Sequence, residues 1–435
     1  MRNDFDPTCC DLIVIGAGPG GYRAAEYAAK QGLQVVIVEQ DEVGGTCLNR
    51  GCIPTKTYVH SASFAEAVER QQQVVQQLRG GVEQLMSAPC ITLLRGHASF
   101  VDSNTVSVQS ANTGCDDTVT AKNIIIATGS TAKLLPLPDI TDPRVMTSTE
   151  LLQLQTLPKR LCIIGAGVIG MEFASVFQRF GSEVTVIEYL KECLPMLDSD
   201  VAKRLRKLLE KRGIQFRMKT AVQSLADIDA DVILMATGRK ANIEGLNIEA
   251  IGIDPTTAVN GLPVDSNFQI SPHIYAIGDV NGRQMLAHAA EMQAVHAVNH
   301  ILGRTDGIRF DIMPAAIFTE PEAACVGPSE DKLKEQGIEY KCRKSFWRAN
   351  GKALAMNETE GMLKLFVSPP ESGGVPEGRG GLNDGLILGC HAYGAHAADI
   401  VQEVSVLMCK HTTISELADM VHIHPTLSEI LKDAI

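Results

Sequence analysis

The chain repeats one strand–turn–helix–strand pattern, and this repeat constrains its fold more than any other feature. The first copy covers residues 10–40, "CDLIVIGAGPGGYRAAEYAAKQGLQVVIVEQ", and the second covers residues 160–189, "RLCIIGAGVIGMEFASVFQRFGSEVTVIEY". In each copy an apolar run leads into G-x-G-x-x-G, a helical stretch follows, and a second apolar run ends in glutamate. This order is typical of dinucleotide-binding βαβ units. We therefore predict an α/β fold with two Rossmann-like domains.

The three glycines of this motif have separate physical roles. The first glycine permits a tight turn, the second lets a pyrophosphate approach the backbone, and the third allows close packing of helix on strand. These glycines are Gly16, Gly18 and Gly21 in the first copy and Gly165, Gly167 and Gly170 in the second. Glu39 and Glu188 each stand 23 residues after the first glycine, where a carboxylate accepts hydrogen bonds from ribose. Because Glu188 would repel a 2′-phosphate, we expect NAD rather than NADP at the second site.

The two copies share a further strand but differ in length. Residues 123–130, "NIIIATGS", and 231–239, "DVILMATGR", are apolar runs that end in Ala-Thr-Gly. The stretch from first glycine to this turn runs from Gly16 to Ala127 in one copy and from Gly165 to Ala236 in the other, so the first carries about 40 more residues. Two dinucleotide sites in one chain suggest electron transfer between a nicotinamide and a flavin.

The extra segment contains "GGTCLNRGCIPTK", in which Cys47 and Cys52 are five positions apart. A structural zinc site would need a second pair of ligands, and the sequence offers none, so we expect no metal. A structural disulfide is unusual in a reducing compartment, and idle thiols remain an alternative. A bridge between residues five apart requires a distorted helix start, which the flanking glycines and Pro54 permit. We also expect the helix N-terminus to lower the thiol pKa values.

With these residues in view, the chain resembles the pyridine nucleotide–disulfide oxidoreductases, most closely their dihydrolipoamide dehydrogenase branch. The motifs that carry the resemblance are "GAGPGGYRAA", "GGTCLNRGCIPTK", "GAGVIGMEFAS", "ATGR", "YAIGDV" and "HIHPTLSE". The resemblance implies FAD at the first site, NAD at the second, and a homodimer. It implies FAD contacts from Gly16, Gly18, Gly21, Glu39, Gly45, Thr46, Lys56, Ala98, Thr128, Gly129, Asp279 and Ala287, and NAD-site residues Gly165, Gly167, Gly170, Glu172, Glu188 and Gly238. Glu172 would be the partner of Lys56.

The resemblance also implies the catalytic residues. Cys47 would exchange with the dithiol substrate, and Cys52 would lie next to the flavin. His424 in "HIHPTLSE" would act as the base, oriented by Glu429, and would complete the cysteine site of the other subunit. A histidine held by a carboxylate suits this role because a thiol must lose its proton before it attacks a disulfide. The expected substrate is dihydrolipoamide on the lipoyl domains of 2-oxoacid dehydrogenase or glycine-cleavage complexes.

Chain length and composition fit this picture. With 435 residues and 45% hydrophobic content, several domains are expected. We predict a discontinuous FAD-binding domain at 1–150 and 243–311, an NAD-binding domain at 151–242, and an α+β dimerisation domain at 312–435. The net charge of −12 disfavours nucleic acid as a partner. The absence of a long apolar run or a leader-like N-terminus indicates no membrane span and a cytoplasmic protein.

Two departures from the family pattern stand out. The chain between "IQFRMKT" (residues 214–220) and "ADVILMATGR" (from residue 230) is short, so a strand meander of the NAD-binding domain is expected to be trimmed. Residues 368–384, "SPPESGGVPEGRGGLND", form a Gly/Pro-rich insertion that predicts a surface loop. Alternatives within the class are a glutathione reductase, which would need basic residues in place of Glu188, and a mercuric reductase, which would need C-terminal cysteines. A flavin-binding protein without catalytic activity is the alternative from another class.

Overall fold

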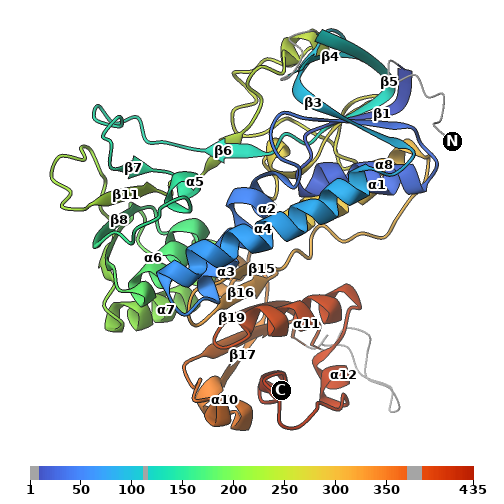
Figure 1. Cartoon of the computed structure of the whole chain (residues 1–435). Helices are drawn as coiled ribbons and strands as arrows, with labels where there is room; N and C mark the ends of the chain where they lie inside the picture. The colour runs from blue at the N-terminus through green and yellow to red at the C-terminus, as the bar shows by residue number, and fades with distance from the viewer. Residues whose placement is uncertain (1–8, 111–115, 370–384) are drawn as a thin grey trace, which may run out of the picture. The chain divides into compact units, whose positions relative to one another are not determined.

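The computed structural model describes residues 9–110, 116–369 and 385–435. The chain forms two compact units, each assembled from separate stretches (Figure 1). The first unit comprises Met1–Leu134, Thr147–Gln155 and Gly238–Ile308, and the second comprises Leu135–Met146, Thr156–Thr237 and Arg309–Ile435. From residue 370 on, the predicted Gly/Pro-rich loop lies outside the described residues. Within the described ranges, every helix is too short or too polar to cross a membrane.

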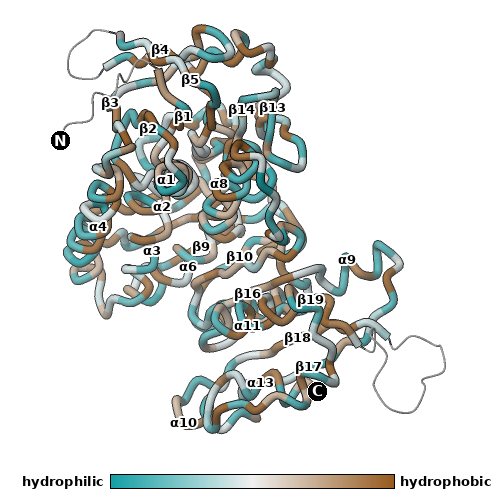
Figure 2. The backbone as a smooth tube through the Cα atoms, turned by 90° about the vertical axis from the view of Figure 1, so that its right-hand side faces the viewer, coloured by the Kyte–Doolittle hydropathy of each residue, from teal (hydrophilic) through white to brown (hydrophobic). Residues whose placement is uncertain are grey.

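The first unit is built on a seven-stranded sheet. Its strands are β1 (Cys9–Ile15), β2 (Val35–Glu39), β3 (Ile91–Phe100), β4 (Thr105–Ser110), β5 (Asp116–Ile126), β13 (Gln269–Ser271) and β14 (Ile274–Ala276). Their order is β1-β2-β3-β4-β5-β14-β13, and β1 also pairs with β5 in parallel. β1 and β2 are almost continuously apolar, as expected of parallel strands covered on both faces. The hydropathy colouring of Figure 2 follows this pattern along both strands.

Two long strands each serve a parallel and an antiparallel part of this sheet. The first half of β3 pairs in parallel with β2, and its second half pairs antiparallel with β4. The change falls at Gly96, where a Cβ atom would lie 2.3 Å from the carbonyl oxygen of Gln109. β5 makes the same transition, from β4 to β1. The parallel part therefore carries the expected βαβ unit, and the antiparallel part accounts for some of the extra length of the first copy.

Helices and short ribbons complete the first unit. They are α1 (Pro19–Lys30), α2 (Gly45–Arg50), α3 (Cys52–Val59), α4 (Phe64–Met86), α5 (Ser148–Leu151), η1 (Ile248–Ile251), η2 (Gly278–Asn281) and α8 (Ala287–Ile301), with a ribbon of β6 (Ser130–Ala132) and β12 (Arg239–Ala241). α1 packs beside α8 (Figure 1). The Tyr27 hydroxyl of α1 donates to Asn299 Oδ1 of α8 at 2.9 Å. Because α1 begins where β1 ends, its N-terminus lies at the carboxyl edge of the parallel strands, where ligands bind in such folds.

The second unit contains a five-stranded parallel sheet with the order β10-β9-β8-β11-β7. Its elements are β7 (Val145–Met146), β8 (Arg160–Ile164), α6 (Val168–Phe180), β9 (Glu183–Ile187), α7 (Ser199–Lys211), β10 (Gln215–Arg217) and β11 (Val232–Met235). Between β10 and β11 the chain forms neither helix nor strand. This agrees with the expectation that a strand meander is trimmed here.

The second unit also contains a five-stranded antiparallel sheet with the order β15-β16-β19-β18-β17. Its elements are β15 (Ala315–Ile317), β16 (Ala323–Val326), α9 (Glu330–Glu335), β17 (Lys341–Phe346), η3 (Trp347–Ala349), α10 (Gly351–Met356), β18 (Met362–Val367), β19 (Ile387–Tyr393), α11 (Ala397–Cys409), α12 (Ile414–Ala418) and α13 (Glu429–Lys432). α11 packs on this sheet and shares its apolar core with β18 and β19. The predicted fold class is therefore confirmed.

Candidate functional site

The glycine turn of the first unit leaves one open face for a ligand. A Cβ atom on Gly16 would lie 2.5 Å from the carbonyl oxygen of Ala127, and one on Gly21 would lie 1.8 Å from the carbonyl oxygen of Gly16. Both glycines are therefore required by packing. A Cβ atom on Gly18, the N-cap of α1, would have its closest contact with the Cα of Gly45, at 3.9 Å, so this position has room. This turn fits the pyrophosphate of FAD, which would accept hydrogen bonds from the helix N-terminus.

Glu39 lies beside this turn, at the end of β2. Its Oε2 accepts a hydrogen bond from the Ala17 backbone at 2.7 Å, and its Oε1 accepts one from Asp41 at 2.8 Å. The side chain is buried, and burial raises the pKa of the carboxyl group. The two backbone bonds fix the carboxylate next to the phosphate turn, where a ribose would lie.

The second unit repeats this geometry. A Cβ atom on Gly165 would lie 2.3 Å from the Ala236 carbonyl oxygen, one on Gly170 would lie 2.0 Å from the Gly165 carbonyl oxygen, and one on Gly167 would meet nothing within 4 Å. Glu188 Oε2 accepts from Ala166 at 2.6 Å, and its Oε1 accepts from Leu190 at 2.7 Å. The same carboxylate bonds therefore recur at both turns, and the second turn fits the pyrophosphate of NAD.

The cysteine segment begins against the first glycine turn. Gly44 has φ +93° and Gly45 has φ +58°, which favours glycine at both positions. A Cβ atom on Gly45 would lie 2.7 Å from the Cα of Gly18. The Gly44 backbone also donates to the Ala17 carbonyl oxygen at 2.8 Å. The two glycines therefore allow α2 to start directly on the phosphate-binding backbone.

A helix break separates the two cysteines. Cys47 lies within α2, which ends at Arg50, and Cys52 is the first residue of α3. Gly51 between them has φ −141° and ψ −111°, outside helical geometry. This is the distortion that the five-residue spacing requires, and it brings the two thiols into hydrogen-bonding contact.

The expectation of a lowered thiol pKa is wrong for Cys47. Its hydrogen bond to Cys52 raises the pKa of the thiol, and burial raises it further. The positive end of the helix therefore does not dominate the pKa of Cys47, whose side chain is half-buried and hydrogen-bonded to Cys52. In the thiol form described, Cys47 keeps its proton near neutral pH, so its reactions require a base.

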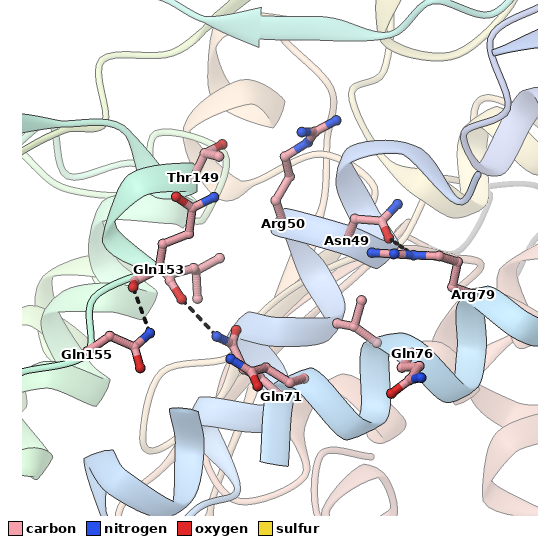
Figure 3. Close-up of a pocket in the computed structure, with 11 residues that line it drawn as sticks. Asn49, Arg50, Gln71, Gln76, Arg79, Thr149, Gln153 and Gln155 are labelled. Carbon is pink, nitrogen blue, oxygen red and sulfur yellow. Dashed lines mark hydrogen bonds between the residues drawn. The ribbon is translucent and has the colours of Figure 1, made fainter. Parts of the chain in front are cut away.

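A pocket of about 460 Å³ borders the cysteine segment (Figure 3). It is lined by Asn49, Arg50, Gln71, Gln72, Val75, Gln76, Arg79, Thr149, Leu152, Gln153 and Gln155. Asn49 lies on α2 and connects this pocket to the start of the cysteine segment, since its Nδ2 donates to the carbonyl oxygens of Val43 and Gly45, both at 2.9 Å. Its Oδ1 accepts from Arg79 at 3.0 Å. Asn49 was not among the predicted site residues, although its position between the cysteines was a signal.

A polar junction forms around Asp279, one of the predicted FAD residues. Ser130 donates from its hydroxyl to Asp279 Oδ2 at 2.5 Å. Arg239 donates to the Ser130 hydroxyl and carbonyl oxygens, both at 2.6 Å, and its Nε lies 3.9 Å from Asp279 Oδ2. Ser130 and Arg239 were not among the residues predicted from the sequence. Each follows an Ala-Thr-Gly turn directly, which was the available signal.

The remaining predicted cofactor residues are distributed over both units. Thr128 donates from Oγ1 to the Asn242 carbonyl oxygen at 2.7 Å, and Gly129 and Gly238 have positive φ. Thr46 is exposed on α2, Lys56 belongs to α3, and Ala287 starts α8. Ala98 is buried in β3, and Glu172 is buried in α6, where its Oε1 accepts from the Phe318 backbone at 2.9 Å. The cofactor contacts of these residues stay predictions.

The predicted base and its carboxylate do come together. His424 Nδ1 lies 3.0 and 3.1 Å from the two carboxylate oxygens of Glu429, and the second of these, Oε2, also accepts from the Thr426 backbone at 3.1 Å. The hydrogen bond from His424 lowers the pKa of Glu429, so this carboxylate stays ionised. The His424 side chain is 77% exposed. Its neighbours Val421 and Ile423 are 99% and 78% exposed, which leaves an apolar segment around the imidazole uncovered within one copy.

Comparison with known families gives a consistent result. The family model for pyridine nucleotide-disulphide oxidoreductases matches residues 10–294, and the model for their dimerisation domain matches residues 313–375 and 381–435. The chain belongs to the pyridine nucleotide-disulphide oxidoreductase family. Members are FAD-dependent oxidoreductases that use a pyridine nucleotide, and the dimerisation domain supports a homodimer.

Individual relatives refine the comparison. The chain is 34% identical to mitochondrial dihydrolipoyl dehydrogenase of Pisum sativum, with 98% of this chain and 90% of that protein covered. It is also 34% identical to dihydrolipoyl dehydrogenase of Chlamydia muridarum, with 97% and 95% covered, and to leghemoglobin reductase of Glycine max, with 98% and 86% covered. Among solved structures, the HOCl-induced flavoprotein disulfide reductase RclA of Escherichia coli matches with a TM-score of 0.87, 30% identity, and 98% and 99% covered.

Proposed function

We propose that the protein is a dihydrolipoyl dehydrogenase, which oxidises protein-bound dihydrolipoamide with NAD⁺ through a Cys47–Cys52 disulfide and bound FAD. The observation that carries the proposal is the helix break at Gly51, which brings Cys47 and Cys52 together beside the first phosphate turn. Glu188 beside the second turn favours NAD⁺ over NADP⁺. The relatives named dihydrolipoyl dehydrogenase support the choice of substrate.

The thiol chemistry divides between the two cysteines. In the oxidised protein, one substrate thiolate attacks the sulfur of Cys47, and Cys52 leaves as a thiolate. The second substrate thiol then attacks the substrate sulfur of this mixed disulfide, which closes the cyclic disulfide of lipoamide and releases Cys47. When bound, FAD supplies the transfer of the resulting electron pair from the dithiol to NAD⁺.

In this proposal His424 is the general base that accepts the proton of the attacking thiol. Glu429 holds Nδ1, so Nε2 is the nitrogen left to take a proton from the attacking substrate thiol. The high pKa of the Cys47 thiol makes such a base necessary in the reverse direction as well. In the proposed homodimer, His424 of one copy serves the cysteines of the other, and the exposed Val421 and Ile423 are covered by that contact.

The test compares substrates on the purified protein. We expect NADH formation from dihydrolipoamide and NAD⁺, with at least a hundredfold loss in both Cys47→Ser and Cys52→Ser. The control is Cys409→Ser, which changes an exposed cysteine of α11 and should retain the activity. Lack of turnover with dihydrolipoamide, together with rapid NADPH oxidation by glutathione disulfide, would reject the assignment.

A second candidate is a disulfide reductase that runs from NADH towards a disulfide substrate. The observation that favours it is the likeness over nearly the full chain to RclA, which is named as a flavoprotein disulfide reductase. The same assay separates the two functions. A dihydrolipoyl dehydrogenase turns over dihydrolipoamide with NAD⁺, whereas this alternative consumes NADH with a disulfide and leaves dihydrolipoamide unused.

A further inference from the structure

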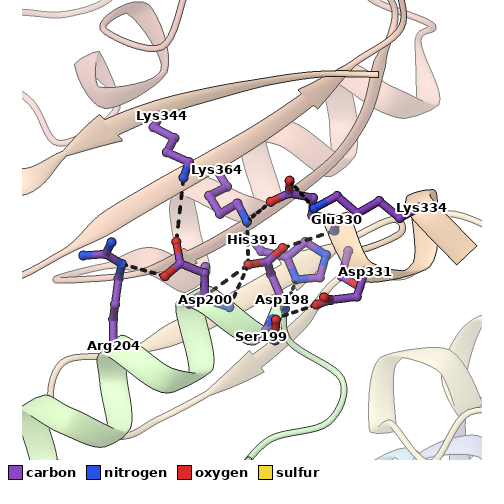
Figure 4. Close-up of polar contacts among 12 residues, drawn as sticks. Asp198, Ser199, Asp200, Arg204, Glu330, Asp331, Lys334, Lys344, Lys364 and His391 are labelled. Carbon is purple, nitrogen blue, oxygen red and sulfur yellow. Dashed lines mark hydrogen bonds and ion pairs between the residues drawn. The ribbon is translucent and has the colours of Figure 1, made fainter. Parts of the chain in front are cut away.

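A lysine is fully buried in the antiparallel sheet of the second unit. Lys364 interrupts the apolar strand β18, and its side chain is 1% exposed. Its Nζ lies 2.7 Å from Asp198 Oδ1 and 2.5 Å from Glu330 Oε2 (Figure 4). Burial disfavours the charged amine, but the hydrogen bonds to these two carboxylates raise the pKa of Lys364 overall. A buried ammonium group is tolerated only with such partners, so the position requires the ion pair.

Asp198 is the centre of this cluster and uses all of its polar atoms. It is 1% exposed and caps α7, because Oδ1 accepts from the Asp200 backbone at 3.1 Å and the Val201 backbone at 3.4 Å. Oδ2 accepts from the Glu330 backbone at 3.1 Å. Its own backbone donates to His391 Nδ1 at 2.9 Å, as Figure 4 shows. Asp198 thus fastens α7 to β18, β19 and the start of α9.

The residues just before Asp198 lie against the second glycine turn. The buried Leu194 donates from its backbone to the Ala166 carbonyl oxygen at 2.9 Å, and Ala166 stands between Gly165 and Gly167. Leu194 has φ +49°, a conformation that leucine adopts only when its surroundings hold it there. The Leu197 backbone closes this segment by donating to the Leu194 carbonyl oxygen at 2.9 Å.

Ala166 is therefore held on both sides. Its backbone N–H is bound by Glu188 at 2.6 Å, and its carbonyl oxygen is bound by Leu194. These two bonds set the orientation of the peptide groups that face a pyrophosphate. Glu188 was predicted from the sequence, whereas the bond from Leu194 depends on a segment whose far end is fixed by the buried ion pair.

We propose that Asp198 and Lys364 are positioning residues for the pyridine nucleotide. Their ion pair anchors the segment Leu194–Asp198 on the dimerisation sheet, and this segment holds the second glycine turn in its binding conformation. The antiparallel sheet thereby affects the affinity of the nucleotide site through the position of the second glycine turn. The inference rests on the proposed function only for the identity of the nucleotide.

The test measures NAD⁺ binding to the flavin-loaded protein by calorimetry. We expect the dissociation constant for NAD⁺ to rise at least tenfold in both Lys364→Met and Asp198→Asn. The asparagine of the second variant keeps a side-chain oxygen that can still cap α7. Hydrogen exchange at the Leu194 amide should quicken in the same variants, while reduction of the protein by dihydrolipoamide keeps its rate. The matched control is Lys334→Ala, which removes an exposed partner of Glu330 at 2.9 Å and should leave NAD⁺ affinity unchanged.

The possible results distinguish a positioning role of Asp198 and Lys364 from a purely structural one. Unchanged NAD⁺ affinity in Asp198→Asn overturns it, even where Lys364→Met does not fold. A purely structural role would lower the melting temperature and leave the dissociation constant intact, which also overturns it. Failure of the unmodified protein to oxidise dihydrolipoamide counts against the proposed function alone, because NAD⁺ binding and hydrogen exchange are read without that substrate.

Discussion

At the scale of single residues, two glycines of the second turn should respond in opposite ways to one added methyl group. A Cβ atom on Gly167 meets nothing within 4 Å and occupies the face left for a pyrophosphate. Gly167→Ala should therefore leave the melting temperature nearly unchanged but weaken NAD⁺ binding at least about tenfold, which corresponds to about 1.4 kcal/mol. Calorimetric titration and thermal unfolding of the same sample measure both quantities.

Gly170→Ala is the matched control for this prediction. Its Cβ atom would lie 2.0 Å from the Gly165 carbonyl oxygen, so α6 must move away from β8. Overpacking of this kind costs about 1–3 kcal/mol, and a lower melting temperature is expected even without nucleotide. If Gly167→Ala destabilised the ligand-free protein as much as Gly170→Ala does, the open face of Gly167 would not be a phosphate site.

At the scale of elements, the contact between β19 and the start of α7 is sensitive to pH. His391 is 1% exposed and accepts the Asp198 N–H, and burial lowers its pKa from 6.5 to about 4. The unfolded chain thus takes up a proton below pH 6.5 that the folded chain refuses, so stability falls as the pH drops from about 6.5 towards 4. The loss attributable to His391 should reach about 2 kcal/mol at pH 5, at about 1.4 kcal/mol per pKa unit.

Denaturant unfolding at pH 7.5, 6.5, 5.5 and 5 tests this, with His391→Gln as the comparison. Glutamine retains an acceptor for the Asp198 N–H but does not titrate, so the variant should be less stable at pH 7.5 and lose less stability on acidification. Hydrogen bonds from Lys334 and Lys364 lower the pKa of the neighbouring Glu330 to about 2, so this carboxylate changes the curves of both proteins only below about pH 5. Parallel curves for the two proteins between pH 7.5 and 5 would contradict the assigned role of His391.

Some features of these elements could be predicted from the sequence, and others could not. The two glycine turns were predictable because G-x-G-x-x-G occurs twice, each time with a glutamate 23 residues after the first glycine, and so was the distortion between Cys47 and Cys52. The form of that distortion, a helix that ends at Arg50 and another that starts at Cys52, depends on the contact of Gly45 with Gly18. Contacts of this kind join distant parts of the chain, so neither they nor the raised pKa of Cys47 could be derived from spacing.

At the scale of the whole molecule, too, contacts between residues far apart in sequence could not be predicted. A lysine in "MLKLFV" read alone indicates a strand edge, whereas the folded chain buries it against Asp198, far away in sequence. Arg239 and Ser130 likewise meet because β6 and β12, far apart in sequence, pair as an antiparallel ribbon. The motifs therefore predicted the two glycine turns and the candidate catalytic residues, but not the polar contacts around them.

The exposure of His424 leads to a prediction for the dimer. The imidazole and the surrounding Val421 and Ile423 are uncovered in one copy, which fits a site completed by the second copy. Cys47→Ser and His424→Gln should each be inactive alone. When the two variants are co-expressed, half of the dimers are mixed, and each mixed dimer contains one site with an intact Cys47 and an intact His424. The mixture should then recover about a quarter of the parent activity, as expected for random pairing in a two-fold dimer.

Differently tagged copies allow the mixed dimers to be purified, and these should show about half of the parent activity per dimer. Inactive mixed dimers with normal flavin content would mean that His424 acts within its own copy or does not serve the cysteines at all.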